Sequence, residues 1–340
     1  MVLFIISAVT LLIFPQVTAR GVINGLNICA NSILPALFPY MVLSNLFIEL
    51  GYGARLSCRM SKFMDKVFHL PPCCASGLVL GCISGFPIGA RIILQEYENQ
   101  RISRKEAEYT LSFCSNAGPA FIFGVVGRQL FHSAAIGAAL WAIHIAAALI
   151  TGFLLRPENT SDHSDLPHYP SQRPSVAFIQ SVEKAGSSVL QICMYVVIFS
   201  VIVENLKAAV PNYLQNTMIF RILYGCLELA GGVRALHGIE STSAFVIASG
   251  LLAWNGLCIH CQVMASPCKS AVSYQSYFKG KLLQMLISIL FSLLLLPLLP
   301  LETGCFADHQ QPSFAFAALM FILAFAVSKT STGKLQHNRI

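Results

Sequence analysis

Apolar stretches long enough to cross a lipid bilayer recur along the whole of this 340-residue chain. A helix rises about 1.5 Å per residue, so about 20 apolar residues span a hydrocarbon core. Hydrophobic residues make up 55% of the chain and charged residues 11%, whereas soluble domains carry about 25% charged residues. A soluble fold could not bury this much apolar surface. The sequence therefore predicts an all-α polytopic membrane protein.

The pattern predicts about eight to ten hydrophobic segments. The segments fall near 1–19, 26–50, 73–95, 107–127, 131–155, 178–207, 216–236, 241–265, 281–300 and 313–328. The first has a second interpretation as a signal peptide, because Val17-Thr18-Ala19 is a tolerable cleavage site. A basic region before the apolar run is absent, so we expect residues 1–19 to be a retained helix.

Two runs of helix-breaking residues interrupt otherwise apolar segments: 84–91 (Ser-Gly-Phe-Pro-Ile-Gly-Ala-Arg) and 115–120 (Ser-Asn-Ala-Gly-Pro-Ala). A broken helix in a bilayer leaves backbone N–H and C=O groups without partners, so breaks survive only where protein or a water-lined cavity satisfies them. The runs therefore predict discontinuous or re-entrant helices around a solute site.

Charge asymmetry predicts the orientation of the chain. Basic residues dominate three segments: Arg55, Arg59, Lys62 and Lys66 in 51–72, Lys269, Lys279 and Lys281 in 266–281, and Lys329, Lys334 and Arg339 in the tail. We expect these segments and both termini in the cytoplasm, and the acidic loop 301–312 outside. The basic loop 96–108 joins the cytoplasmic side if 73–95 and 107–127 are both re-entrant.

The sequence divides into two halves around a polar, proline-rich linker at 157–175. We predict an N-terminal helix at 1–20, repeats at 21–156 and 176–301, and a C-terminal helix with a basic tail at 302–340. The repeats rest on three ordered matches, although chance similarity between apolar segments is an alternative. The matches place 31–44 over 187–200, 81–83 over 225–227, and 116–119 near 254–257.

Polar residues at the breaks are the candidate substrate-binding groups. They are Ser84, Gly85, Pro87, Gly89, Arg91, Ser115, Asn116, Gly118, Pro119, Glu228, Asn255, Gly256, His260 and Gln262. A helix that begins after Pro87 offers free N–H groups to an anion, and Arg91 adds a fork suited to carboxylate. Alternatively, Arg91 extends to the membrane surface or pairs with Glu96.

The other polar candidates each have a structural alternative. Asn116 lines the site or ties two helices together. Glu228 is an ionisable group within a span and a candidate proton carrier, or it pairs with Arg221 or Arg234. His260 shuttles protons or packs as a hydrogen-bonded residue.

Other chemistry finds little support in the sequence. The net charge of +7 comes from scattered membrane-flanking residues, so we expect no nucleic-acid partner. No phosphate-binding G-x-x-x-x-G-K-[ST] loop occurs, and the serines lack a paired base and acid. Most cysteines lie in apolar segments and act as small apolar residues. We therefore predict no enzyme activity, no cofactor and no metal.

Three strings, at 25–44, 84–91 and 113–122, make the chain resemble the sporulation integral membrane proteins of the YlbJ type, in the nucleoside-recognition (Gate) domain group. The resemblance covers nearly the whole chain, with Phe86 where tyrosine is expected and Arg91 where lysine is common. It implies a cell-membrane protein of an endospore former, linked to export of dipicolinic acid from the mother cell.

Three functions are compatible with these features. The first is a transporter or permease of a small organic anion, with dipicolinate as the solute that the resemblance implies. The second is a nucleoside permease, and the third is a non-transporting membrane protein that organises a sporulation assembly. The predicted partners are the lipid bilayer and either an anion or a nucleoside, and the oligomeric state is open.

Overall fold

Every regular element in the part of the chain that the computed structural model describes, residues 14–157, 173–265 and 272–299, is a helix. Six of these helical runs are long and apolar enough to cross a membrane. They are Pro15–Glu49, Arg104–Leu130, Ala134–Leu154, Pro174–Ala209, Ser241–Met264 and Gln275–Leu298. The predicted all-α polytopic fold is confirmed.

Exposed apolar stripes show which helix faces contact lipid. In α16 (Gln275–Leu295), leucines recur at four-residue spacing on the exposed face: Leu282, Leu286, Leu290 and Leu294. In α10 (Pro174–Ala209), the exposed face carries Leu190, Met194, Ile198 and Ile202. Residues four apart lie on one helix face, so these are continuous apolar surfaces. The fold is that of a multi-pass protein embedded in a bilayer.

The first half of the described chain begins with one long helical run and ends with another crossing. Its elements are α2 (Pro15–Ile28), the π-helical turn η1 (Cys29–Ile33), α3 (Leu34–Glu49), α4 (Tyr52–Phe63), η2 (Met64–Phe68), α5 (Cys74–Ser84), α6 (Ile88–Glu98), α7 (Arg104–Cys114), α8 (Pro119–Phe121), η3 (Ile122–Leu130) and α9 (Ala134–Leu154).

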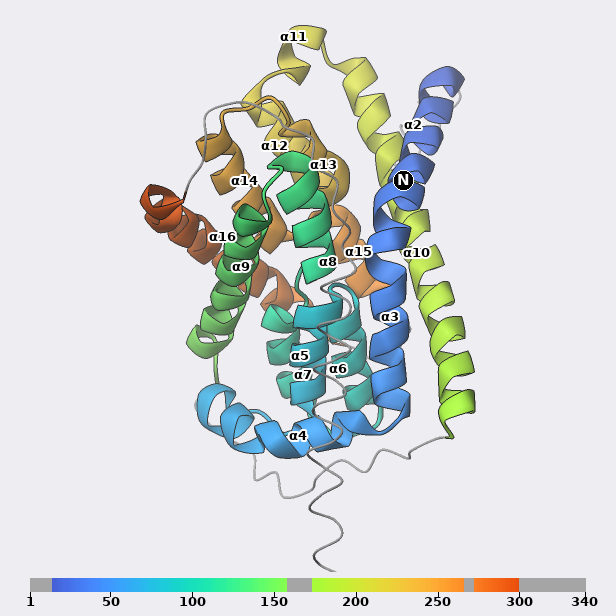
Figure 1. Ribbon diagram of the computed structural model, residues 1–340, viewed down its shortest axis with the longest axis vertical. Helices are drawn as coiled ribbons and strands as arrows, with labels where there is room; N and C mark the ends of the chain where they lie inside the picture. The colour runs from blue at the N-terminus through green and yellow to red at the C-terminus, as the bar shows by residue number, and fades with distance from the viewer. Residues whose placement is uncertain (1–13, 158–172, 266–271, 300–340) are drawn as a thin grey trace, which may run out of the picture. The chain divides into compact units, whose positions relative to one another are not determined.

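The second half has the same succession: a long helix, a short hairpin, an interrupted helix and a final crossing. Its elements are α10, α11 (Asn212–Gln215), α12 (Met218–Leu227), α13 (Leu229–Ala235), α14 (Ser241–Trp254), α15 (Leu257–Met264), α16 and the 3-10 turn η4 (Leu296–Leu298). The run α2–α3 and the helix α10 lie side by side and point in opposite directions (Figure 1). The two halves are therefore inverted relative to each other.

Small residues hold the two long helices together. A Cβ atom added at Gly21 would lie 2.6 Å from the Cα of Val201, and one at Gly25 would lie 2.7 Å from the Cα of Val197. Neither distance is compatible with a side chain, so only glycine permits this approach. Close backbone contact is how membrane helices associate, since apolar side chains gain little by leaving lipid.

Several sequence-based boundaries need correction. The segments 1–19 and 26–50 were expected to be separate crossings, but the chain from Pro15 to Glu49 is one helical run. Pro15 stands in the first turn of the run, where the missing N–H costs nothing, whereas Pro35 and Pro39 lie within the run. The linker core 158–172, the predicted C-terminal helix and residues 1–13 lie outside the described residues.

The two segments expected to be re-entrant differ from each other. The 73–95 segment is re-entrant, because α5 and α6 form a hairpin that turns at Gly85–Pro87. The 107–127 prediction is wrong: α7, α8 and η3 form one interrupted crossing that leads from the α4 end to the opposite end (Figure 1). The sequence run at 115–118 breaks the helix without reversing it.

The hairpin of each half closes on paired glycines. A Cβ at Gly81 would lie 2.1 Å from the carbonyl oxygen of Cys114 and 3.1 Å from the Cα of Gly89. In the second half, a Cβ at Gly232 would lie 2.0 Å from the Cα of Gly225. The sequence match of 81–83 with 225–227 thus falls on equivalent close contacts.

The loop between α6 and α7 lies at the same end of the molecule as α4. Figure 1 shows α4 lying across that end, below α5 and α7, and the thiol of Cys73 donates a 3.9 Å hydrogen bond to the carbonyl of Arg101. Since the hairpin reverses the chain, residues 51–72 and 99–103 lie on one side of the membrane. The start of α2 lies at the opposite end.

Gly81→Ala tests the hairpin packing. We expect it to lower the free energy of unfolding by about 1–3 kcal/mol, because the new methyl group overlaps the Cys114 carbonyl. Gly186→Ala is the matched control: it lies in α10 with nothing within 4 Å of an added Cβ, and we expect stabilisation of up to about 1 kcal/mol. Thermal unfolding in detergent measures both, and equal melting temperatures would contradict the packing.

Cysteine accessibility tests the hairpin's effect on topology. Cys58 in α4 is the exposed one among the cysteines in the described ranges, so it serves as a native reporter. In a Cys58→Ser chain, we expect Lys105→Cys to react with a membrane-impermeant maleimide from the same side as native Cys58. Tyr213→Cys should react from the opposite side. Labelling of all three positions from one side would contradict the inverted halves.

Candidate functional site

In each half, the break of the hairpin packs against the break of the interrupted helix. Gly85 has a left-handed φ of 84°, and a Cβ there would lie 2.8 Å from the amide nitrogen of Gly118. Gly256 has a φ of 78°, and a Cβ there would lie 3.2 Å from the amide nitrogen of Leu229. Both positions favour glycine for two reasons: the positive φ angle and the lack of room for a side chain. In each half, the break of the hairpin therefore lies against the break of the interrupted helix.

The two interrupted helices are joined through the break of α7–α8. The side-chain amide of Asn255, at the end of α14, donates a 3.1 Å hydrogen bond to the carbonyl oxygen of Ser115. Lys281 of α16 donates a second hydrogen bond to the same oxygen. All three residues are buried. A carbonyl freed by the break of the first half is thus satisfied by side chains of the second.

A buried polar cluster extends from this junction, and we call it the junction cluster: Ser115, Asn116, His144, Asn255, Lys281 and Gln284. Gln284 accepts from Lys281 at 2.7 Å and donates to Oδ1 of Asn116 at 3.1 Å. His144 accepts a 2.9 Å hydrogen bond from the amide of Ala117, inside the break. The cluster therefore satisfies the broken backbone at membrane depth, as a bilayer requires.

Lys281 overturns part of the charge analysis. The sequence places it in the cytoplasmic loop 266–281, but it lies within α16 and its exposed fraction is 0%. The neighbouring Gly280 explains how α16 approaches so closely, since a Cβ there would lie 2.3 Å from the carbonyl oxygen of Ser112. The sequence analysis counts Lys281 among the charges that flank a membrane segment, whereas the structure places it in the protein interior.

His260 adjoins the junction cluster through an aromatic neighbour. Its Nδ1 lies 2.8 Å from the hydroxyl of Tyr277, and its ring packs edge-on against Trp254 at 4.5 Å between centroids. Its Nε2 atom is buried without a hydrogen-bond partner. The residue is thus held at one nitrogen and has a free position at the other.

A cavity of about 20 Å³ lies where the two halves face each other. Both hairpins, both interrupted helices and both long helical runs contribute to its wall, which is apolar apart from Glu228 and Gln262. The lining residues are Ile33, Leu37, Phe86, Phe121, Ile192, Val196, Glu228, Leu229, Ala230, Cys258, Ile259 and Gln262. The volume suits a single water molecule, so the structure is a closed form of this site.

Glu228 and Gln262 are the residues of the cavity wall whose side chains carry oxygen or nitrogen atoms for hydrogen bonds. The Glu228 carboxylate accepts from the amides of Ala230 at 2.8 Å and Gly231 at 2.5 Å, capping α13. Its predicted pairing with Arg221 is wrong, because that guanidinium donates to the carbonyls of Ala235 and His237. The side-chain oxygen of Gln262 is buried without a partner, which leaves an acceptor for a bound solute.

Each hairpin carries one arginine that ties it to the long helical run of the other half. Arg91 of α6 donates to Ser188 and Gln191 of α10, and Arg234 of α13 donates to Ser32 of η1. The pairing of Arg91 with Glu96 is wrong, since Glu96 forms an ion pair with Arg101 at 3.1 Å. Sequence matching aligns Ser32 with Ser188, so the two contacts are equivalent.

These arginines border the cavity rather than line it. Gln191 and Ser32, two of their acceptors, each directly precede a lining residue, Ile192 and Ile33. Neither arginine forms an ion pair with a carboxylate in the described ranges. The guanidinium of Arg234 does lie near enough to the Glu228 carboxylate for a longer-range electrostatic attraction. Two cations therefore flank the site from opposite halves, and neither is held in a direct ion pair among the described residues.

The remaining predicted residues shape the first hairpin and the interrupted helix that packs against it. Ser84 ends α5 and hydrogen-bonds Ser44 of α3, and Pro87 precedes α6 after a cis peptide bond. A Cβ at Gly89 would lie 2.2 Å from the carbonyl oxygen of Cys114. Pro119 is the first residue of α8. These residues position the site without offering it side-chain donors.

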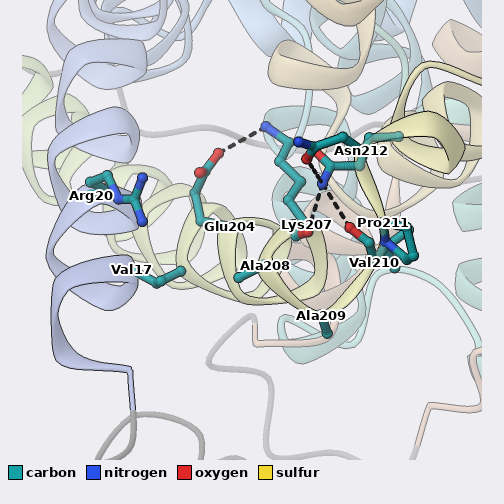
Figure 2. Close-up of a pocket in the computed structure, with 10 residues that line it drawn as sticks. Val17, Arg20, Glu204, Lys207, Ala208, Ala209, Val210, Pro211 and Asn212 are labelled. Atoms are coloured by element: carbon teal, nitrogen blue, oxygen red, sulfur yellow. Dashed lines mark hydrogen bonds and ion pairs between the residues drawn. The ribbon is translucent and has the colours of Figure 1, made fainter.

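A larger hollow, of about 620 Å³, lies at the ends of α2 and α10 that are remote from α4. Figure 2 shows Arg20 reaching from α2 toward Glu204, which forms an ion pair with Lys207 at 2.8 Å. None of its lining residues comes from a helix break.

No group of His, Cys, Asp and Glu suited to a metal ion occurs among the described residues.

Sequence reasoning did not single out Lys281, Gln284, Arg234 or His144 as site residues. The 3.6-residue helical period offers one signal for the first two, since Lys281 and Gln284 lie on one face with Ser288 and Ser292, opposite the leucine stripe. Four polar residues on one face of a membrane helix indicate a buried polar seam. No local signal marks Arg234, because its partner is 202 residues away.

Comparison with curated proteins shows similarity to the sporulation integral membrane protein YlbJ of Bacillus subtilis (strain 168). The two are 24% identical over 353 aligned positions, which cover 93% of this chain and 85% of the relative. No family model matches the chain, and no solved structure matches it. The resemblance to the YlbJ type is confirmed, and assignment to the Gate domain group stays a prediction.

Gln284→Leu tests whether the junction cluster stabilises the fold. The change leaves the Asn116 carbonyl and the Lys281 ammonium each short of a partner, and every buried polar group left unsatisfied costs about 1–3 kcal/mol. We expect a clear loss of thermal stability in detergent. Gln275→Leu, at the exposed start of α16, is the matched control and should change stability by less than about 0.5 kcal/mol. Equal effects would contradict the cluster's role.

Proposed function

We propose that this chain, a relative of the YlbJ-type sporulation integral membrane proteins, transports a small organic anion across the membrane. The single observation that carries the proposal is the cavity between the inverted halves, to which both hairpins, both interrupted helices and both long runs contribute. Secondary transporters bind solutes at the interface of inverted repeats, between discontinuous helices. The proposal assigns the chain no catalytic activity.

The charge around the cavity favours an anion. Its wall includes the first turns of α8 and α15, and helix N-termini carry positive partial charge and free N–H groups. Arg91 and Arg234 add two flanking cations from opposite halves. The Glu228 carboxylate caps α13 and accepts from the amides of Ala230 and Gly231. Those two N–H groups are therefore not open to a solute, in contrast to the first turns of α8 and α15.

The shape of the wall favours a flat solute. Phe86 and Phe121 line the cavity, and their ring centroids are 6.3 Å apart. Aromatic side chains pack well against a planar ring. A planar diacid with carboxylates on opposite edges could meet one arginine from each half, and dipicolinate is the diacid that the family resemblance implies.

A nucleoside is the second candidate, and the acceptors in the wall favour it. The Gln262 side-chain oxygen has no partner, and the Glu228 carboxylate can accept further hydrogen bonds from hydroxyl groups. A nucleoside offers such donors and carries no charge that needs Arg91. The two candidates therefore differ in which side chains they require.

The α4 end, in our proposal, faces the cytoplasm. Basic residues gather there: Arg55, Arg59, Lys62, Lys66, Arg101, Arg104, Lys105, Arg156 and Arg173. The opposite end carries fewer: Arg20, Arg128, Lys207 and Arg221. An excess of lysine and arginine marks the cytoplasmic side, which puts the start of α2 on the outer side.

Uptake into vesicles tests the function. Wild-type protein in liposomes should move labelled dipicolinate faster than empty liposomes. Arg91→Ala should lower the rate at limiting solute at least about tenfold, because a charge-assisted bond to carboxylate contributes about 1.5–3 kcal/mol. Arg59→Ala, at an exposed position of α4, is the matched control and should transport normally.

The same assay separates the alternatives. Movement of a nucleoside, with a loss in Glu228→Gln and none in Arg91→Ala, would favour the nucleoside permease. If wild-type vesicles move neither solute, the transport proposal fails in favour of a non-transporting assembly protein.

A further inference from the structure

Lys281 is a cation placed at the junction of the two halves. Its side chain is completely buried, and its ammonium donates to the carbonyl oxygen of Ser115 and to Oε1 of Gln284. Burial of a charge in a membrane interior is costly, and ionisable residues there mark ion or proton pathways. A neutral amide could make the same two hydrogen bonds, so a structural tie alone does not require lysine.

The surroundings of Lys281 contain no compensating acid. Its acceptors are uncharged, and no carboxylate pairs with it in the described part of the chain. The titratable groups that face it from the packed elements are His144 of α9, Cys114 of α7, Cys82 of α5, His260 of α15 and Tyr277 of α16. α14 also packs on α16 and contributes no titratable residue.

The ammonium occupies the kind of position where a coupling metal ion would bind. Unwound carbonyls in transporter helices coordinate Na⁺ or accept a proton donor, and Ser115 is such a carbonyl, at the end of the broken α7. Lys281 and Asn255 already use it. Because the lysine ammonium occupies this oxygen, a metal ion does not need to bind there. The charge that can move at this position is then a proton of the ammonium.

We propose that Lys281 is the site where this protein takes up and releases the proton that drives solute movement, an inference that rests on the proposed transport function. In one cycle, an N–H bond of the ammonium breaks and the proton passes to water on one side of the membrane. The freed lone pair on Nζ then binds a proton from water on the other side. Lysine returns unchanged, and one proton has crossed.

Release of the proton weakens the tie between the halves. The neutral amine keeps hydrogen-bond donors but loses its charge, and a charge-assisted hydrogen bond is about twice as strong as a neutral one. The Ser115 carbonyl then depends mainly on Asn255. Protonation of Lys281 therefore favours the closed junction, and deprotonation frees the two interrupted helices to separate.

Accumulation in liposomes tests the proposal. If one proton accompanies each solute, a gradient of one pH unit sustains about tenfold accumulation. We expect this in the wild type without sodium, and no accumulation in Lys281→Met, which should still exchange labelled for unlabelled solute. Lys281→Arg, which keeps its charge, should also fail to accumulate. Lys279→Met, at an exposed position two residues earlier, is the matched control.

The outcomes separate the two proposals. Exchange by the wild type together with sodium-dependent accumulation, or with accumulation retained in Lys281→Met, overturns the role of Lys281 and leaves transport intact. Absence of exchange in the wild type overturns transport, and with it the coupling.

A second measurement needs no solute and covers variants that fail to fold. Protein labelled with ¹³Cε-lysine should give a resonance that is missing in Lys281→Arg and that moves as the pH is changed, because the ammonium and the amine give different shifts. A Lys281 resonance that stays constant at every pH at which the protein stays folded would overturn proton exchange at this residue. The Lys279 resonance provides the internal comparison.

Discussion

The carbonyl oxygen of Ser115 is the point on which the arrangement of the two halves depends. A backbone carbonyl freed by a helix break would cost several kcal/mol in hydrocarbon if it had no partner. Here Asn255 and Lys281 both donate to it. The break in the first half therefore depends on side chains of the second half for its hydrogen bonds, which ties the two halves together at the level of the breaks.

Local chemistry explains which parts of the site could be predicted. Gly85, Gly118 and Gly256 stand at breaks because glycine permits backbone shapes and close contacts that other residues do not, and that property is visible in the sequence. The pairing of each hairpin break with an interrupted helix is not visible, since it joins segments more than 25 residues apart. His144 shows the same limit: its imidazole accepts from Ala117, 27 residues away.

The charge pattern was less informative than the breaker pattern, for a physical reason. Positive-inside counting treats every lysine near a span as a solvated charge, and Lys281 is near the start of one. Its burial depends on Gly280 allowing α16 to approach α7, which is a packing fact. Likewise the prediction listed 1–19 and 26–50 as separate segments, whereas the chain is helical from Pro15 to Glu49 and the π-helical turn η1 continues the helix.

The crossed arginine contacts have an evolutionary consequence. Arg91 reaches the long helix of the second half and Arg234 that of the first, so a substitution at Ser188 or Ser32 alters the anchoring of a hairpin encoded in the other half. Selection on the two halves is thereby coupled crosswise. Each half can change at these positions only as fast as the opposite half accommodates the change, whether or not the halves arose from one ancestral segment.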